Sequence, residues 1–237
     1  MDATRYTTLT RQMGLFREMD VVANNIANAA TTGFRQQGLV FSEHVQRARG
    51  GASVSMATGN VALTSFAQGS LTQTGGRFDL AIEGDGFFMV ETPEGARMTR
   101  AGAFTPNNAG YLVTAQGHMV LDVGEAPIFI PPDAKSLMIA EDGSISADGR
   151  LIGQVGVFQP VDRTELLRQD GVLMQANSGV ELAQSAKVKQ GFLEGSNVDA
   201  IGQIARMIEV QRAYEMGQSF LDTENERVRA ALQTLIR

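Results

Sequence analysis

The last forty residues constrain the fold more than any other part of the chain. Residues 197–236 contain no proline, and apolar or small side chains recur there in steps of three, four or seven. These positions are Met207, Val210, Tyr214, Gly217, Leu221, Val228, Leu232 and Leu235. The spacing predicts a helix with a heptad seam, roughly 60 Å long at a rise of about 1.5 Å per residue. Such a helix extends past any globule of 25.4 kDa, so it needs a partner helix.

A second, shorter helix is predicted at the N-terminus. Its apolar stripe consists of Leu15, Met19, Val22 and Ile26. Asn24, Asn25 and Asn28 are poor helix formers that lie inside or directly after this stripe. Two interpretations stay open. Either the helix frays toward Gly33, which acts as a left-handed cap, or the asparagine amides fix the register across a helix-helix contact between subunits.

The middle of the chain has the composition of strands and turns. It holds 23 of the 26 glycines and all six prolines, between residues 31 and 195. Phe78, Leu80 and Ile82 alternate with other residues before a Gly-Asp-Gly turn. Short, evenly spaced strands predict a mainly β body, antiparallel and irregular, of the sandwich or barrel-like type. Residues 37–60 have the composition of a connector, either a mobile loop or a segment ordered against a neighbouring subunit.

Composition argues against several classes of function. The net charge of -6 offers no basic surface for nucleic acid. With no run of 18 apolar residues and no charged-then-apolar leader, we expect neither membrane insertion nor a cleaved signal peptide. The absence of cysteine excludes disulfides, thiol nucleophiles and cysteine-based metal sites.

The sequence contains no catalytic constellation. The only two histidines, His44 and His118, lie far from each other in the chain and lack metal-ligand spacing. Residues 142–148 superficially resemble a calcium loop, but Ser144 and Ser146 replace the expected acids and no glutamate closes it. We therefore expect no enzyme activity, no catalytic or cofactor-binding residue, no cofactor and no metal.

Four blocks of sequence resemble one known family. They are residues 23–28 with 31–35, residues 68–71 with 79–88, residues 99–104 with 110–114, and residues 195–199 with 211–215. Their order and spacing are similar to those of bacterial flagellar rod and hook proteins, and they span nearly the whole chain. Within that family, the chain most resembles the proximal-rod members.

The resemblance implies a structural subunit of the flagellar basal-body rod, the axial drive shaft that transmits motor torque. The implied partners are other proximal-rod subunits, the distal-rod protein and the base of the basal body, in both homo- and hetero-assembly. The implied location is the periplasm, after export through the flagellar apparatus. Two alternatives stay open: a distal-rod or hook subunit, and an extracytoplasmic β-domain binding module that oligomerises through its terminal coil.

These observations predict four segments. The N-terminal helix occupies residues 1–36, the connector 37–60, the β-rich body 61–194 and the C-terminal helix 195–237. The two helices should pack together as one discontinuous coiled-coil domain. We expect them to be disordered in a free subunit because each would lack a partner, and we expect substitution of Gly33 to leave the β body unaffected.

The residues expected at subunit interfaces come from both ends of the chain. In the N-terminal helix they are Leu15, Met19, Val22, Asn24, Asn25, Ile26, Asn28, Gly33 and Phe34. In the C-terminal helix they are Asn197, Val198, Met207, Val210, Gln211, Arg212, Tyr214, Leu221, Val228, Leu232 and Leu235.

Overall fold

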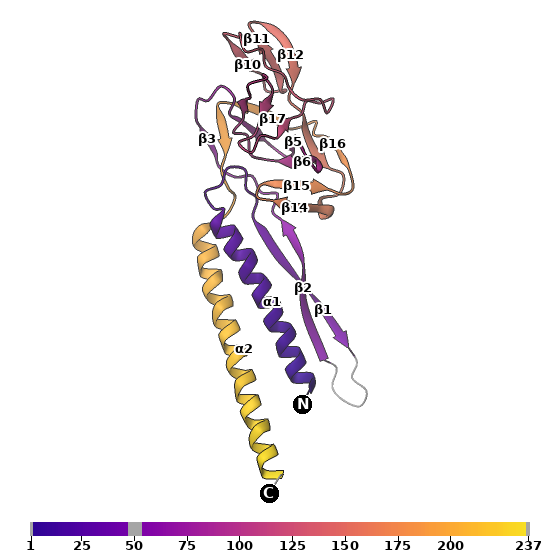
Figure 1. Cartoon of the computed structure of the whole chain (residues 1–237), viewed down its shortest axis with the longest axis vertical. Coiled ribbons are helices and arrows are strands. Elements are labelled where there is room, and N and C mark those ends of the chain that lie inside the picture. Colours follow the sequence, from indigo (N-terminus) through magenta and orange to yellow (C-terminus); the bar gives the residue numbers. More distant parts are fainter. Residues whose placement is uncertain (1, 47–53, 236–237) are drawn as a thin grey trace. The chain divides into compact units, whose positions relative to one another are not determined.

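The chain divides into two compact units. The computed structural model describes residues 2–46 and 54–235 (Figure 1), and side chains within residues 7–40 and 63–234. The helical unit comprises Met1–Ala27, Gln37–Leu63 and Asp199–Arg237. The β unit comprises Asn28–Gln36 and Thr64–Val198.

The helical unit is built on two antiparallel helices. Helix α1 (Asp2–Ala27) and helix α2 (Ala200–Leu235) lie side by side (Figure 1). The 36 residues of α2 span about 54 Å. The fold class is thus confirmed: a mainly antiparallel β body with two terminal helices that pack together, and no closed barrel. Because α1 and α2 come from one chain, each already has a partner in a free subunit, and the reason for expecting disorder there is removed.

The seam between α1 and α2 combines apolar packing with polar contacts. Val22 and Val210 are buried, and most other predicted seam positions of α2 are half-buried. Arg206 Nε donates to Glu18 Oε1 at 2.7 Å. Gln12 Nε2 donates to the carbonyl oxygen of Tyr214 at 2.9 Å. These contacts fix the register of the two helices.

The segment expected as a connector contains strands. Strand β1 (Gln37–Gln46) pairs with strand β2 (Val54–Thr64) in a two-stranded sheet that belongs to the helical unit. Valine, phenylalanine and threonine, which favour strands, occur within these two ranges, whereas Gly50 and Gly51 fall between them in the sequence. The connector prediction rested on Gly50, Gly51, Ser53, Ser55 and Gly59, of which Ser55 and Gly59 lie within β2.

The β unit contains short strands, numbered in chain order, some of which Figure 1 labels. Strands β3–β9 are Leu71–Gln73, Leu80–Glu83, Phe87–Thr92, Gly95–Thr99, Thr105–Pro106, Leu112–Val113 and Met119–Val120. Strands β10–β18 are Leu137–Ile139, Ser144–Ala147, Arg150–Gln154, Val157–Pro160, Leu166–Asp170, Leu173–Ala176, Val180–Leu182, Lys187–Gln190 and Phe192–Glu194, with the short 3₁₀ helix η1 at Arg163–Glu165.

These strands form one large sheet and three small ones. The nine-stranded sheet has the order β14-β15-β6-β5-β9-β8-β7, and β13 joins it through β5 and carries β16. Strands β10-β11-β12 form a three-stranded sheet, and β17-β4 and β18-β3 form two-stranded sheets. Every strand pair whose register is described in the β unit is antiparallel.

Strand β5 lies at the centre of the packing because both of its faces are buried. Phe88 and Val90 pack into one apolar cluster, together with Leu80 and Ile82 of β4. Phe87 and Met89 point to the opposite face and pack into a second cluster. This explains why β5 reads as a continuous apolar run rather than an alternating one.

Candidate assembly interface

The buried carboxylate of Glu194 contacts residues from the blocks of sequence that resemble the rod and hook family. Glu194 is 1% exposed. Its Oε1 lies 3.0 Å from Arg35 Nη2 and its Oε2 lies 2.9 Å from Arg100 Nη1. Oε1 also accepts a hydrogen bond from the backbone N–H of Gly69 at 2.9 Å. Because Arg35, Gly69, Arg100 and Glu194 come from the four blocks or directly adjoin them, one part of each block meets at this point in the β unit.

Backbone contacts complete this cluster. The N–H of Gly33 donates to the Glu194 carbonyl at 2.8 Å, and the N–H of Gly195 donates to the Ser70 carbonyl at 2.8 Å. The side chain of Asn197 accepts from the N–H of Gln36 at 2.6 Å and donates to the Ala67 carbonyl at 2.7 Å. We call Arg35, Arg100, Glu194 and these backbone partners the Glu194 cluster. It ties together the β-unit segments that lead into the helical unit along the chain.

The cluster holds more positive than negative charge. Burial lowers the pKa of Arg35 to about 10, with Arg100 as the second cause. Burial likewise lowers the pKa of Arg100. A third guanidinium, that of Arg168, stacks 4.2 Å from the ring centroid of Phe34 and donates to the carbonyl of Arg35. Since Glu194 faces two buried cations, its removal would leave both without their shared counter-charge.

Several residues expected at subunit interfaces therefore lie inside the β unit. Phe34 is 1% exposed, and Gly33 is buried. Asn197 and Val198 are half-buried, and the side-chain amide of Asn197 forms hydrogen bonds within the chain. Asn28 accepts a hydrogen bond from Thr31 at 3.1 Å, also within the β unit. These residues are thus part of the internal structure of the β unit.

Gly33 is required by close backbone packing and not by a helix cap. Helix α1 already ends at Ala27, whereas Gly33 has a φ of 71° and a Cβ there would overlap the backbone of Arg100 and Ala101. We expect Gly33→Ala to lower the melting temperature of the β unit markedly, which reverses the expectation from the sequence. Gly75→Ala is the matched control, because Gly75 has a φ of 72° and open space around it. Calorimetry should show a small loss of about 1 kcal/mol for Gly75→Ala and a loss several times larger for Gly33→Ala. Equal losses would contradict the packing role.

The other expected residues lie in the helical unit. The less exposed ones form the seam between α1 and α2: Leu15, Met19, Val22, Asn25, Ile26, Met207, Val210, Tyr214, Leu221 and Val228. Asn24, Gln211, Arg212 and Leu232 are exposed. Leu235 is the last residue of α2, and its side chain lies outside the described part. The seam residues thus hold one chain's helices together.

Asn25 makes its described hydrogen bonds within one chain, and these contacts test neither interpretation of the asparagines. Its amide donates to the carbonyl of Gln37 at 2.8 Å and to Gln203 Oε1 at 3.1 Å. Its Oδ1 accepts from the N–H of Gln37 at 3.0 Å. All three residues belong to the helical unit, so Asn25 fixes the position of α1 against α2 and β1.

Apolar side chains remain exposed on both helices after α1 and α2 pack together; those on α1 were expected to widen its apolar stripe, and those on α2 were missed by the sequence prediction. On α1 these are Leu9, Met13 and Phe16, spaced like one face of the helix. On α2 one group is Ile201, Ile204 and Ile208, and a second is Met216 and Phe220. Ile201 is 82% exposed. The three isoleucines could have been found from the sequence, because they recur at helical spacing next to the seam positions.

A groove of about 240 Å³ runs between the two helices. Its walls are Thr8, Arg11, Gln12 and Leu15 from α1, and Ala213, Met216, Gly217 and Phe220 from α2. Gly217 permits the close approach of Gln12, whose amide nitrogen a Cβ at this position would overlap. Gln12 Oε1 is buried and has no hydrogen-bond partner among the described residues. The groove therefore offers mainly apolar surface, because the Gln12 oxygen is itself buried.

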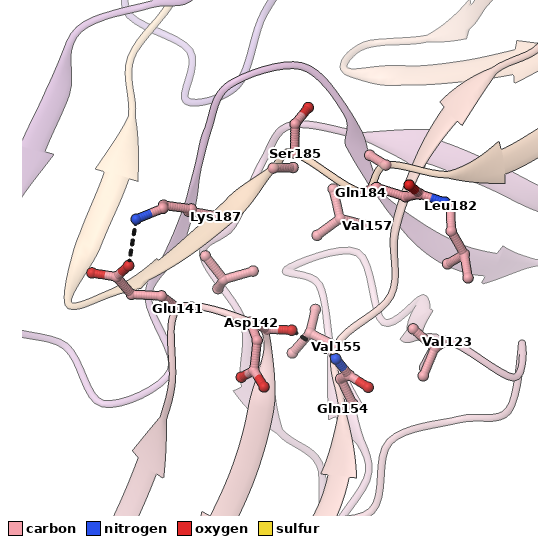
Figure 2. Close-up of a pocket in the computed structure, with 13 residues that line it drawn as sticks. Val123, Glu141, Asp142, Gln154, Val155, Val157, Leu182, Gln184, Ser185 and Lys187 are labelled. Atoms are coloured by element: carbon pink, nitrogen blue, oxygen red, sulfur yellow. Dashed lines mark hydrogen bonds and ion pairs between the residues drawn. The ribbon is translucent and has the colours of Figure 1, made fainter.

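The β unit carries a larger hollow of about 630 Å³ (Figure 2). Val123, Val155, Val157 and Leu182 line it with apolar surface, and Lys187 Nζ lies 2.8 Å from Glu141 Oε2 at its margin. This hydrogen bond lowers the pKa of Glu141. The thirteen lining residues include no histidine or cysteine, and among the described residues no three metal-binding side chains come together. Neither α1 nor α2, within the described ranges, has a stretch long and apolar enough to cross a membrane.

Three family models match separate parts of the chain. The model for the flagella basal body rod protein matches residues 6–35. That for the D1 domain of the flagellar hook protein FlgE/F/G matches residues 81–147, and that for the C-terminal part of the flagellar basal body rod FlgEFG protein matches residues 189–234. The matches define the class as an axial structural protein of the bacterial flagellum.

Comparison with full-length relatives identifies the family within this class. The flagellar basal-body rod protein FlgF of Caulobacter vibrioides is 39% identical over 241 residues, which is 99% of this chain and 98% of the relative. FlgF of Mesorhizobium japonicum is 38% identical, covering 91% of this chain and 90% of the relative. FlgG of Bacillus subtilis is 32% identical, covering 93% and 94%. The chain belongs to the flagellar basal-body rod protein family and is a structural subunit of the rod. The resemblance to FlgF, with FlgG as the near competitor, is confirmed.

Proposed function

We propose that this chain is a FlgF-like subunit of the proximal rod and that it enters the rod through the exposed apolar side chains of its helical unit. The observation that carries the proposal is that packing α1 against α2 leaves large apolar side chains exposed on both helices. Burying one such side chain contributes about 1.5–3 kcal/mol. Contact with neighbouring subunits would remove this surface from water.

The mechanical role follows from the helices. A contact between different surfaces of identical or related subunits generates a filament when it does not close. Helices of 26 and 36 residues packed along such a filament would resist bending and torsion, as a shaft that transmits torque must. The proposed partners are other proximal-rod subunits, the distal-rod protein and the base of the basal body, in the periplasm. The role requires no catalysis.

Electron microscopy of isolated basal bodies tests the position in the rod. A strain that lacks this chain should form only a shortened proximal rod, with no distal rod and no hook, and expression of the chain should restore the complete structure. A proximal rod of normal length without a distal rod would assign the chain to the distal position. A complete rod and hook would contradict the proposal.

Phe16→Asp tests the exposed surface of α1. Because Phe16 is 55% exposed, the substitution should leave the melting curve of the soluble chain unchanged. It should nevertheless reduce the amount of chain in isolated rods at least tenfold, since a carboxylate buried at a contact is unfavourable by several kcal/mol. Leu151→Asp is the control, because Leu151 is 72% exposed on the β unit. Immunoblots showing normal entry of the Phe16→Asp chain would rule out a contact at this face.

A further inference from the structure

Helix α2 carries an apolar ridge and one wall of an apolar groove at separate positions along its length. The ridge consists of Ile201, Ile204 and Ile208, all exposed. The wall consists of Ala213, Met216 and Phe220. At about 100° per residue, the ridge points roughly 120° away from the wall around the helix axis. One chain therefore presents the ridge and the groove on different faces, the arrangement that leads to an open contact between successive copies.

The ridge and the groove wall have the same spacing. Ala213, Met216 and Phe220 lie twelve residues after Ile201, Ile204 and Ile208, respectively. The first and last residues of each set lie seven positions, or about 10 Å, apart. The groove also has the small residue Ala213 on its α2 side, which leaves space for a branched side chain, whereas the space beside Gly217 is filled by Gln12. A ridge of isoleucines thus fits this groove in length and in shape.

Charged residues follow each apolar set along α2, and those after the ridge have the opposite sign to those twelve residues further on. Arg212 is the next ridge position after Ile208, and twelve residues later stands Glu224. Glu215 follows on the ridge, and twelve residues later stands Arg227. Glu224 and Arg227 already form an ion pair with each other at 2.7 Å. A neighbour's Arg212 and Glu215 would extend this pair into a network of alternating signs.

We infer that the groove binds the isoleucine ridge of a second copy of this chain, with α2 of successive copies parallel and shifted by twelve residues, or about 18 Å. The inference rests on the proposed function and names its partner. In this contact Ile204 of one copy packs against Met216 of the next. The contact covers the groove that Gln12 lines.

Disulfide cross-linking tests the contact directly, because the chain contains no cysteine of its own. Two chains with different tags, one with Ile204→Cys and the other with Met216→Cys, are expressed together, and rods are isolated and mildly oxidised. We expect a product that carries both tags, at about twice 25.4 kDa. The register control pairs Ile204→Cys with Leu232→Cys, whose exposed position lies sixteen residues, or about 24 Å, beyond Met216. This pair should give at least tenfold less product.

The outcomes separate the inference from the proposed function. Rods that contain both tagged chains without the Ile204–Met216 product, or with equal product from the control pair, overturn the inference and leave the proposed function intact. A link to a different basal-body protein also overturns it. If the cysteine variants fail to enter rods, the wild-type rod decides by electron cryo-microscopy: adjacent α2 helices shifted by about 18 Å support the contact, and any other shift overturns it. Absence of the wild-type chain from rods defeats the proposed function itself.

Discussion

Replacement of Glu194 by alanine should lower the melting temperature of the β unit by roughly 10 °C. The carboxylate lies between the guanidinium groups of Arg35 and Arg100, and all three side chains are almost completely buried. Removing one partner of a buried ion pair costs about 3–5 kcal/mol because the remaining charge stays buried without compensation. Here two cations are left, and the N–H of Gly69 loses its acceptor as well. Differential scanning calorimetry of the purified chain measures the effect.

Two further variants isolate the cause. Glu194→Gln keeps the volume and an acceptor but removes the charge, so its melting temperature should lie between those of the wild type and Glu194→Ala. Glu83→Ala removes a carboxylate whose ion pair with Lys189 is partly exposed, and it should lower the melting temperature by less than about 3 °C. If Glu194→Ala behaved like Glu83→Ala, the Glu194 cluster would not stabilise the β unit.

Val210→Asp should unfold the helical unit and leave the β unit intact. Val210 is buried at the centre of the seam between α1 and α2, where a carboxylate finds no partner and costs several kcal/mol. Far-ultraviolet circular dichroism should lose most of its helical signal, while the melting transition of the β unit stays within about 2 °C of the wild type. The chain should be absent from isolated rods, and cells should be non-motile.

Ile204→Asp is the matched control on the same helix. Ile204 is exposed, so the variant should keep its helical signal and still fail to enter the rod. The pair of variants separates folding of the helical unit from assembly. If Val210→Asp also lowered the melting temperature of the β unit by 10 °C or more, the two units would not be independent, and assembly could not be assigned to the helices.

The terminal helices and the β body could be predicted from local patterns. The heptad spacing from Met207 to Val228 matches the less exposed side of α2, because a period of 3.5 residues places those side chains on one face. The alternation around Leu80 and Ile82 likewise corresponds to β4, which is buried. In both cases the information lies within a few residues of the chain.

The role of the family blocks could not be predicted in this way. Arg35 and Glu194 are 159 positions apart, and nothing in the neighbourhood of either residue indicates that they form one buried ion pair. The sequence therefore suggested subunit contacts for Gly33 and Phe34, which the structure places inside the β unit. The isoleucine ridge was missed for another reason: α2 has two apolar faces, and the prediction used only the longer one, the heptad seam.

Hydrogen exchange tests most directly whether the helical unit is the part that assembles. Backbone amide exchange would be compared, residue by residue, between the soluble chain and isolated rods. The account predicts that amides of α1 and α2 become at least a hundredfold better protected in rods, since local opening of the exposed helix pair is suppressed by contact with neighbours. Most amides of the β unit should exchange at similar rates in both states. New protection confined to the strands of the β unit, with none in α1 and α2, would contradict it.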